Sequence, residues 1–86
     1  MENTEGQRAA ASAVRKTAIE GWARENKVTL NKLTVTSSTV LVRVVKHNRW
    51  DGGMAEYIGL KKLIGWGRGD VRNHARFVEF FFERKG

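Results

Sequence analysis

Histidine and asparagine side chains are the first candidates for catalysis, because they occur as two adjacent pairs. His47 is followed by Asn48, and Asn73 is followed by His74. Imidazole and carboxamide groups can surround a metal ion that activates water for cleavage of a phosphodiester. The spacing does not indicate a shared site, and the chain has no cysteine, no phosphate-binding loop and no paired carboxylates of the kind that hydrolases use. We therefore expect no catalytic residue, no metal site and no cofactor, and a binding protein rather than an enzyme.

Tryptophan close to arginine is the second candidate for chemistry. Trp50 follows Arg49, and Trp66 lies between two glycines just before Arg68. Exposed tryptophans in such places stack on the bases of single-stranded DNA or RNA while the cations contact phosphate. A tryptophan beside a tight turn also packs against the core, because this side chain is heavily buried on average. Trp50 and Trp66 are therefore candidate base-stacking residues, with anchoring to the core as the alternative.

The net charge indicates the class of partner. The 86 residues include 16 Lys and Arg and nine Asp and Glu, for a formal net charge of +7. Residues 27–76 contain ten of the cations and three of the anions, so this middle region carries the whole excess. Clustered cations favour a polyanionic partner, and nucleic acid is the one we expect. The alternative is a phage-type inhibitor or accessory protein whose basic face binds an acidic protein, such as a host enzyme or a nucleoprotein complex.

Length and composition limit the architecture to one small domain. Hydrophobic residues make up 41% and charged residues 29% of the chain, as in ordinary globular proteins. Residues 1–7 have no periodic apolar positions and are expected to form a flexible tail, which leaves residues 8–86 as the domain. The acidic N-terminus and the absence of a long apolar stretch predict a soluble cytoplasmic protein that does not contact membranes.

A helix followed by a β-hairpin is predicted for the first half of the domain. Apolar and small residues recur at helical spacing through residues 8–26, with Trp22 on the apolar stripe and therefore in the core. Residues 28–36 and 39–47 are rich in Val, Thr and Leu and flank a pair of serines. These two segments are typical of strands joined by a tight turn.

The predicted register of this hairpin gives its two faces different chemistry. Pairing Thr36 with Thr39 places alternating leucine and valine side chains on a core face. The same pairing brings Lys32 opposite Arg43 on the other face. Two cations this close repel each other unless an anion lies over them. A basic sheet face is therefore expected.

Two helices are predicted for the second half, which makes the expected fold α+β with the order helix, β-hairpin, helix, helix. Residues 54–64 repeat apolar side chains at helical spacing, and glycines at positions 65, 67 and 69 end the pattern. A last helix is predicted over residues 71–84, because a helical projection separates the charged side chains of that segment from its four phenylalanines. Asp70 can cap the start of this helix.

Alternation argues against a strand in the Phe-rich segment. A strand would place Phe77 and Phe81 on the same face as Glu79 and Glu83. We therefore favour a helix, despite the high β-propensity of phenylalanine. Its apolar arc includes His74, expected as a packed histidine, and is wider than one contact face. This width predicts a homodimer through the Phe-rich last helix.

The segment IGLKKLIGWGRGDVRNHARF, residues 58–77, resembles the helix-turn-helix of small bacterial and phage DNA-binding proteins. At the apolar, turn-glycine and β-branched positions of that family, this sequence has Leu60, Ile64, Gly65, Trp66 and Val71. Lys61 stands where the family has alanine. The resemblance covers about twenty residues and implies a protein that binds double-stranded DNA, with transcriptional regulation as its role.

The resemblance also implies which side chains contact DNA. The start and exposed flank of the second helix would enter the major groove, where arginine pairs with guanine and asparagine with adenine. The residues in those places are Arg68, Arg72, Asn73 and Arg76. Phosphates would be contacted by Lys61 and Lys62 on the preceding helix and by Lys46 and Arg49 at the end of the hairpin.

Overall fold

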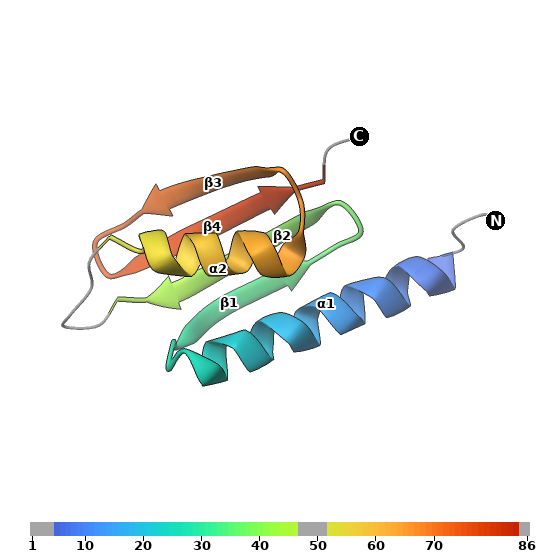
Figure 1. Cartoon of the computed structure of the whole chain (residues 1–86), viewed down its shortest axis with the longest axis horizontal. Coiled ribbons are helices and arrows are strands. Elements are labelled where there is room, and N and C mark those ends of the chain that lie inside the picture. The colour runs from blue at the N-terminus through green and yellow to red at the C-terminus, as the bar shows by residue number, and fades with distance from the viewer. Residues whose placement is uncertain (1–4, 47–51, 85–86) are drawn as a thin grey trace.

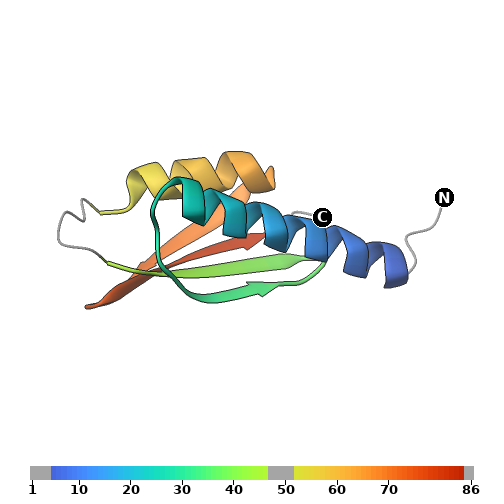
Figure 2. The same ribbon diagram turned by 90° about the horizontal axis from the view of Figure 1, so that it is seen from below.

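One antiparallel sheet with two helices on the same face forms the described part of the molecule. The computed structural model describes residues 5–46 and 52–84. In chain order its elements are α1 (Glu5–Glu25), β1 (Leu30–Val35), β2 (Thr39–Val45), α2 (Met54–Ile64), β3 (Arg68–Asn73) and β4 (Phe77–Glu83). The strands form a four-stranded sheet of order β1-β2-β4-β3 in which all neighbours are antiparallel (Figure 1). Both helices lie on one side of this sheet (Figure 2).

The prediction of a first helix is confirmed, and its end has a specific backbone geometry. Lys27 adopts a left-handed conformation with φ of 56°. The backbone N–H of Val28 donates to the carbonyl of Ala23 at 2.9 Å, and that of Lys27 donates to Arg24 at 3.3 Å. These are the two hydrogen bonds of a Schellman motif, which satisfies carbonyls at the end of a helix and turns the chain. The chain is thereby directed into β1.

The predicted hairpin register is also confirmed. Lys32 pairs with Arg43 across β1 and β2, and the backbone N–H of Thr36 donates to the carbonyl of Thr39 at 2.9 Å. The prediction of a helix at residues 54–64 is confirmed by α2. That helix ends at Gly65, whose φ of 77° is available to glycine without strain. Within the described residues, no helix is long and apolar enough to cross a membrane.

The prediction of a last helix is wrong. Residues 68–73 and 77–83 form the strands β3 and β4, so the fold is α-β-β-α-β-β rather than α-β-β-α-α. The physical reason is pairing with β2, since Val40, Val42 and Val44 lie opposite Phe82, Phe80 and Val78 and all six side chains are fully buried. Burial of these side chains against β2 outweighs the helical pattern of the segment, and it agrees with the preference of phenylalanine and valine for strands. Asp70 therefore caps no helix, and the Phe-rich helix proposed as a dimer surface does not exist.

Helix α2 packs closely on the sheet because β3 has a glycine beneath it. A Cβ atom at Gly69 would lie 2.6 Å from the Tyr57 hydroxyl oxygen and 2.9 Å from a ring carbon of Phe82. The rings of Tyr57 and Phe82 are stacked with their centroids 5.5 Å apart. Ile19 from α1 and Leu60 from α2 complete the fully buried core. Both helices thus pack on one face of the sheet, and no helix or strand among the described residues covers the other face.

Candidate nucleic-acid interface

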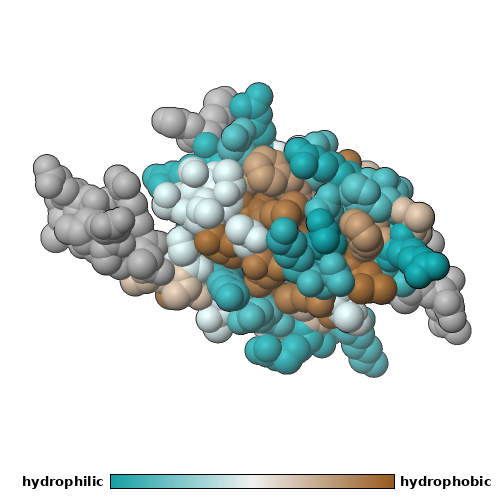
Figure 3. Space-filling model, turned by 180° about the vertical axis from the view of Figure 1, so that it is seen from behind, coloured by the Kyte–Doolittle hydropathy of each residue, from teal (hydrophilic) through white to brown (hydrophobic). Residues whose placement is uncertain are grey.

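The sheet face opposite the helices, here called the open face, combines aromatic and charged side chains. The strand registers place on it Lys32 and Thr34 from β1, Thr39, Leu41, Arg43 and Val45 from β2, Phe77, Glu79, Phe81 and Glu83 from β4, and Arg68, Asp70 and Arg72 from β3. Figure 3 shows this face, where brown, apolar residues gather among teal, hydrophilic ones. Apolar and aromatic side chains that lie among charged ones are suited to a ligand with both flat apolar surfaces and charged groups.

Two phenylalanines of the central strand β4 each have an arginine over the ring. The Arg43 guanidinium carbon lies 4.7 Å from the ring centroid of Phe77, and that of Arg72 lies 5.3 Å from the centroid of Phe81. Both rings are partly exposed. They are four residues apart on one strand, which separates them by roughly 13 Å. The open face therefore carries two separate stacks of a ring and a guanidinium.

Arg43 is held in place by Glu79. Its Nε and a terminal guanidinium nitrogen donate to the same carboxylate oxygen at 3.1 and 2.8 Å. The second oxygen of Glu79 lies 2.7 Å from Nε2 of His74. The Arg43 hydrogen bond and then that of His74 lower the pKa of Glu79, although burial opposes them. This network orients the guanidinium of Arg43 on the ring of Phe77.

Acid should weaken the fold through Glu79. Because the folded-state pKa of Glu79 is lowered, its contribution to stability is present at neutral pH and is lost as the pH falls below about 4.5. In urea unfolding at about pH 7 and about pH 3, the wild type should lose more stability than Glu79→Gln, by on the order of 1 kcal/mol. Glu25→Gln, at the exposed end of α1, is the control for removal of a carboxylate. An equal loss in wild type and Glu79→Gln would contradict this role of the network.

A hollow of about 310 Å³ lies on the open face beside the edge strand β3. It is lined by Arg68, Gly69, Asp70, Arg72, Phe81 and Glu83. Arg68 and Glu83 approach each other to 3.6 Å, and Arg72 and Asp70 to 3.5 Å. This is the place on the open face where donors, acceptors and an aromatic ring surround one concave surface.

Additional cations lie at both ends of the central strands. Arg76, in the turn before β4, accepts a backbone hydrogen bond from Lys46 at 3.0 Å. At the opposite end, Arg84 donates its backbone N–H to Ser38 at 2.8 Å. Together with the four cations of the open face, these three give seven positive charges against three carboxylates. The net charge of the face and its ends is positive.

The predicted DNA-binding residues are divided between the two sides of the molecule. Arg68 and Arg72 lie on the open face, and Arg76 lies beside it in the β3–β4 turn. Asn73, the last residue of β3, is exposed but alternates away from the open face. The second helix of a helix-turn-helix is absent, because β3 occupies its place. The expected major-groove contacts therefore have no recognition helix to present them.

The remaining predicted residues lie elsewhere. Lys46 follows the last residue of β2, whereas Lys61 and Lys62 are exposed on α2, on the helical side. Arg49 and Trp50 lie outside the described residues. Trp66 is partly buried and packs against the core, with the Arg15 guanidinium 4.7 Å over its ring. This arrangement agrees with the anchoring alternative for Trp66.

The histidines do not form a metal site in the described part of the chain. His47 lies outside it, and no cluster of three or more His, Cys, Asp or Glu side chains is found within it. His74 was expected in the apolar arc of a helix, which is wrong. It lies in the β3–β4 turn, 42% exposed, with its ring centroid 4.7 Å from that of Phe77. Its contact with Glu79, whose side chain lies on the open face, places His74 at the edge of that face.

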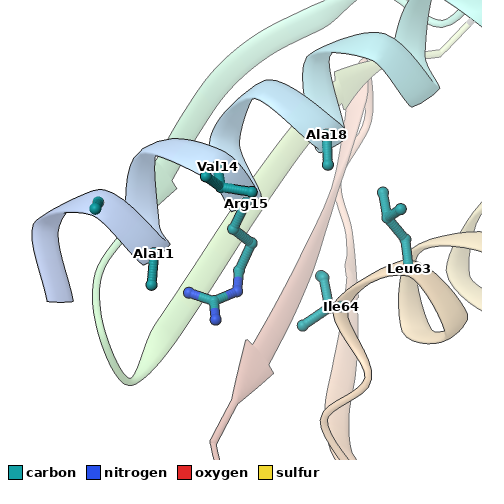
Figure 4. A pocket seen from close by; sticks show the side chains of 7 residues that line it. Ala11, Val14, Arg15, Ala18, Leu63 and Ile64 are labelled. Atoms are coloured by element: carbon teal, nitrogen blue, oxygen red, sulfur yellow. The ribbon is translucent and has the colours of Figure 1, made fainter. Parts of the chain in front are cut away.

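A hollow on the helical side is apolar. It measures about 470 Å³ and lies between α1 and the end of α2, where Ala18 and Arg15 point toward Leu63 and Ile64 (Figure 4). Among the described residues that line it, Arg15 is the one with a charge. Such a surface has no set of polar groups that would orient a small ligand. The open face is therefore the better candidate site.

Several residues of the candidate site were not predicted from the sequence. Phe77 and Phe81 were assigned to a helical core, and Asp70 to a helix cap. Their signal in the sequence is the alternation of FVEFFFE, in which every second residue is buried in the core.

Comparison with protein families, with curated proteins and with solved structures finds no match for the chain.

Proposed function

We propose that this protein binds single-stranded nucleic acid on the open face of its sheet. The observation that carries the proposal is the pair of partly exposed phenylalanines, Phe77 and Phe81, each with an arginine from a neighbouring strand over its ring. Aromatic side chains and guanidinium planes are the groups on which unstacked bases pack. The net charge of +7 supports the same class of partner.

The positions of the remaining cations support contacts with the phosphate backbone. Lys46 and Arg76 lie at one end of the central strands and Arg84 lies at the other. A strand whose bases stack along β4 would place phosphates near both ends. Each cation that neutralises a phosphate releases counterions, which favours binding at low salt.

A single strand fits the open face better than a duplex. The aromatic rings lie in the middle of a sheet, and they can pack only on base faces that are not already stacked in a helix. Within the described residues, both helices lie on the other side of the sheet, so neither can enter a groove of a duplex held on the open face. Base stacking rather than groove reading is therefore the proposed mode.

Fluorescence anisotropy with labelled single-stranded DNA, single-stranded RNA and duplex DNA tests this proposal. We expect both single strands to bind at least about tenfold more tightly than the duplex, because stacking contributes about 1 to 3 kcal/mol per base. The affinity for a single strand should fall with rising salt, with a slope of about −0.7 for each phosphate contacted.

Two results would contradict the proposal. Equal or tighter binding of the duplex would mean that stacking on the open face does not contribute. Negligible binding of all three nucleic acids at low salt would favour the alternative in which the basic surface binds an acidic protein.

A further inference from the structure

We infer that the hollow beside β3, here called the β3 pocket, takes one guanine base of the bound strand. This inference rests on the proposed function and adds to it a preference for one base. The β3 pocket is lined by Arg68, Gly69, Asp70, Arg72, Phe81 and Glu83.

The size of the β3 pocket limits its occupant. Its volume of about 310 Å³ lies at the lower end of the range for small-ligand sites. The ring of Phe81 belongs to its lining, and the guanidinium of Arg72 lies 5.3 Å from the centroid of that ring. A base that stacks on Phe81 would take the place of this guanidinium on the ring, and Arg72 would then lie at the edge of the base. The pocket therefore suits one nucleotide rather than two.

The charged groups of the β3 pocket have hydrogen-bonding capacity left over. The closest approach is 3.6 Å between Arg68 and Glu83 and 3.5 Å between Arg72 and Asp70. Charge-assisted hydrogen bonds are about 2.7 to 2.9 Å long, so both pairs are loose. Their side chains are 74% and 47% exposed in the first pair and 56% and 62% in the second. A ligand can therefore reach all four groups.

The third ion pair of the open face is shorter and more buried than the two pairs of the β3 pocket. Arg43 and Glu79 meet at 2.8 Å, and their side chains are only 27% and 10% exposed. That pair is satisfied within the protein. The two pairs of the β3 pocket have a similar composition and longer distances. Asp70 Oδ1 also accepts from the backbone N–H of Val71 at 3.0 Å, and the remaining lone pairs of both carboxylates can accept from a ligand.

Guanine is the base whose edges match this set of groups most fully. It presents two adjacent donors, N1–H and N2–H, on one edge and two adjacent acceptors, O6 and N7, on the other. A carboxylate can accept from the first edge while a guanidinium donates to the second, each through two hydrogen bonds. Adenine and thymine present no edge with two adjacent donors, and cytosine has one donor on its pairing edge. Asp70 and Glu83 supply the carboxylates, and Arg68 and Arg72 supply the guanidiniums.

The test measures base preference with DNA single strands of about ten nucleotides, a length within the usual site size. The strands consist of thymine, with guanine, adenine, cytosine or thymine at the central position. We expect the wild type to bind the central-guanine strand roughly tenfold more tightly than the other three. The double variant Asp70→Asn, Glu83→Gln should lose most of this preference, because carboxamides cannot replace the two-acceptor carboxylates at the N1–H and N2–H edge. The matched control Glu20→Gln, Glu25→Gln changes the charge equally on α1 and should keep the preference.

The outcomes separate the inference from the proposed function. Equal binding of all four strands by the wild type, or an unchanged preference in the pocket variant, would overturn the guanine assignment and leave single-strand binding intact. No binding of any strand would overturn both. Guanosine monophosphate should compete poorly, because it cannot also stack on Phe77. Competition as strong as that of the unlabelled strand would show a site for the free nucleotide and would overturn the assignment to a strand.

Discussion

Replacing Phe80 by alanine should destabilise the protein by about 3 to 5 kcal/mol, the usual cost of removing a buried phenylalanine. Phe80 is fully buried on the central strand β4 and lies between Val42 on one side and Val71 on the other. Its removal takes away one of the two largest core side chains, at the point where the two hairpins join. A small domain is stable by about 5 to 15 kcal/mol, so the variant should be close to unfolding. Urea unfolding followed by circular dichroism measures the loss.

The neighbouring phenylalanine is the control for this prediction. Phe81→Ala removes the same atoms from the partly exposed open face and should cost about 1 kcal/mol or less. In the helix predicted from the sequence, both residues would lie in one apolar arc and would have similar costs. Similar losses for the two variants would therefore contradict the strand assignment of β4. A large difference would support it.

The first half of the fold could be predicted because its signals are local. The end of α1 and the tight turn between β1 and β2 depend on residues close together in the chain. The pairing of Lys32 with Arg43 follows from the turn alone. The same holds for α2, which ends at Gly65 because that glycine takes a positive φ.

The second half could not be predicted in this way because β4 depends on a partner distant in sequence. Phe82 lies opposite Val40, and Phe80 lies opposite Val42, more than thirty residues earlier. The argument against a strand assumed that a sheet face carrying both Phe77 and Glu79 would be unfavourable. That assumption is wrong here, since Glu79 is paired with Arg43 and both helices cover the other face.

Some residues of the candidate site were predicted from the sequence, but as parts of a helix that the protein does not form. Arg68 and Arg72 were chosen as major-groove contacts of a helix, and strand alternation places both on the open face instead. Lys61 and Lys62 were chosen by the same resemblance and lie on the helical side. The carboxylates that distinguish the β3 pocket were not identified, because their closeness to the arginines depends on the pairing of β3 with β4.

Replacing Phe77 and Phe81 together by alanine should weaken binding of single-stranded DNA by at least about thirtyfold, because each lost stacking contact costs about 1 to 3 kcal/mol. The rings are partly exposed, so the variant should remain folded, which thermal unfolding would verify. The lysines and arginines remain, so the salt dependence of binding should keep its slope. A lower affinity with an unchanged slope is the specific signature of lost stacking.

A matched variant distinguishes the open face from the helical side. Ile58→Ala with Leu63→Ala removes two exposed apolar side chains of α2, which are 46% and 44% exposed. This variant should bind single-stranded DNA as the wild type does. If it lost affinity while the phenylalanine variant kept it, the strand would lie on the helical side beside Lys61 and Lys62.

Arg76→Ala should reduce both the affinity for single-stranded DNA and the salt slope, the latter by about 0.7 for one phosphate, because it removes charge and leaves the rings in place. The two kinds of variant therefore separate the stacking contribution from the electrostatic one on the same face.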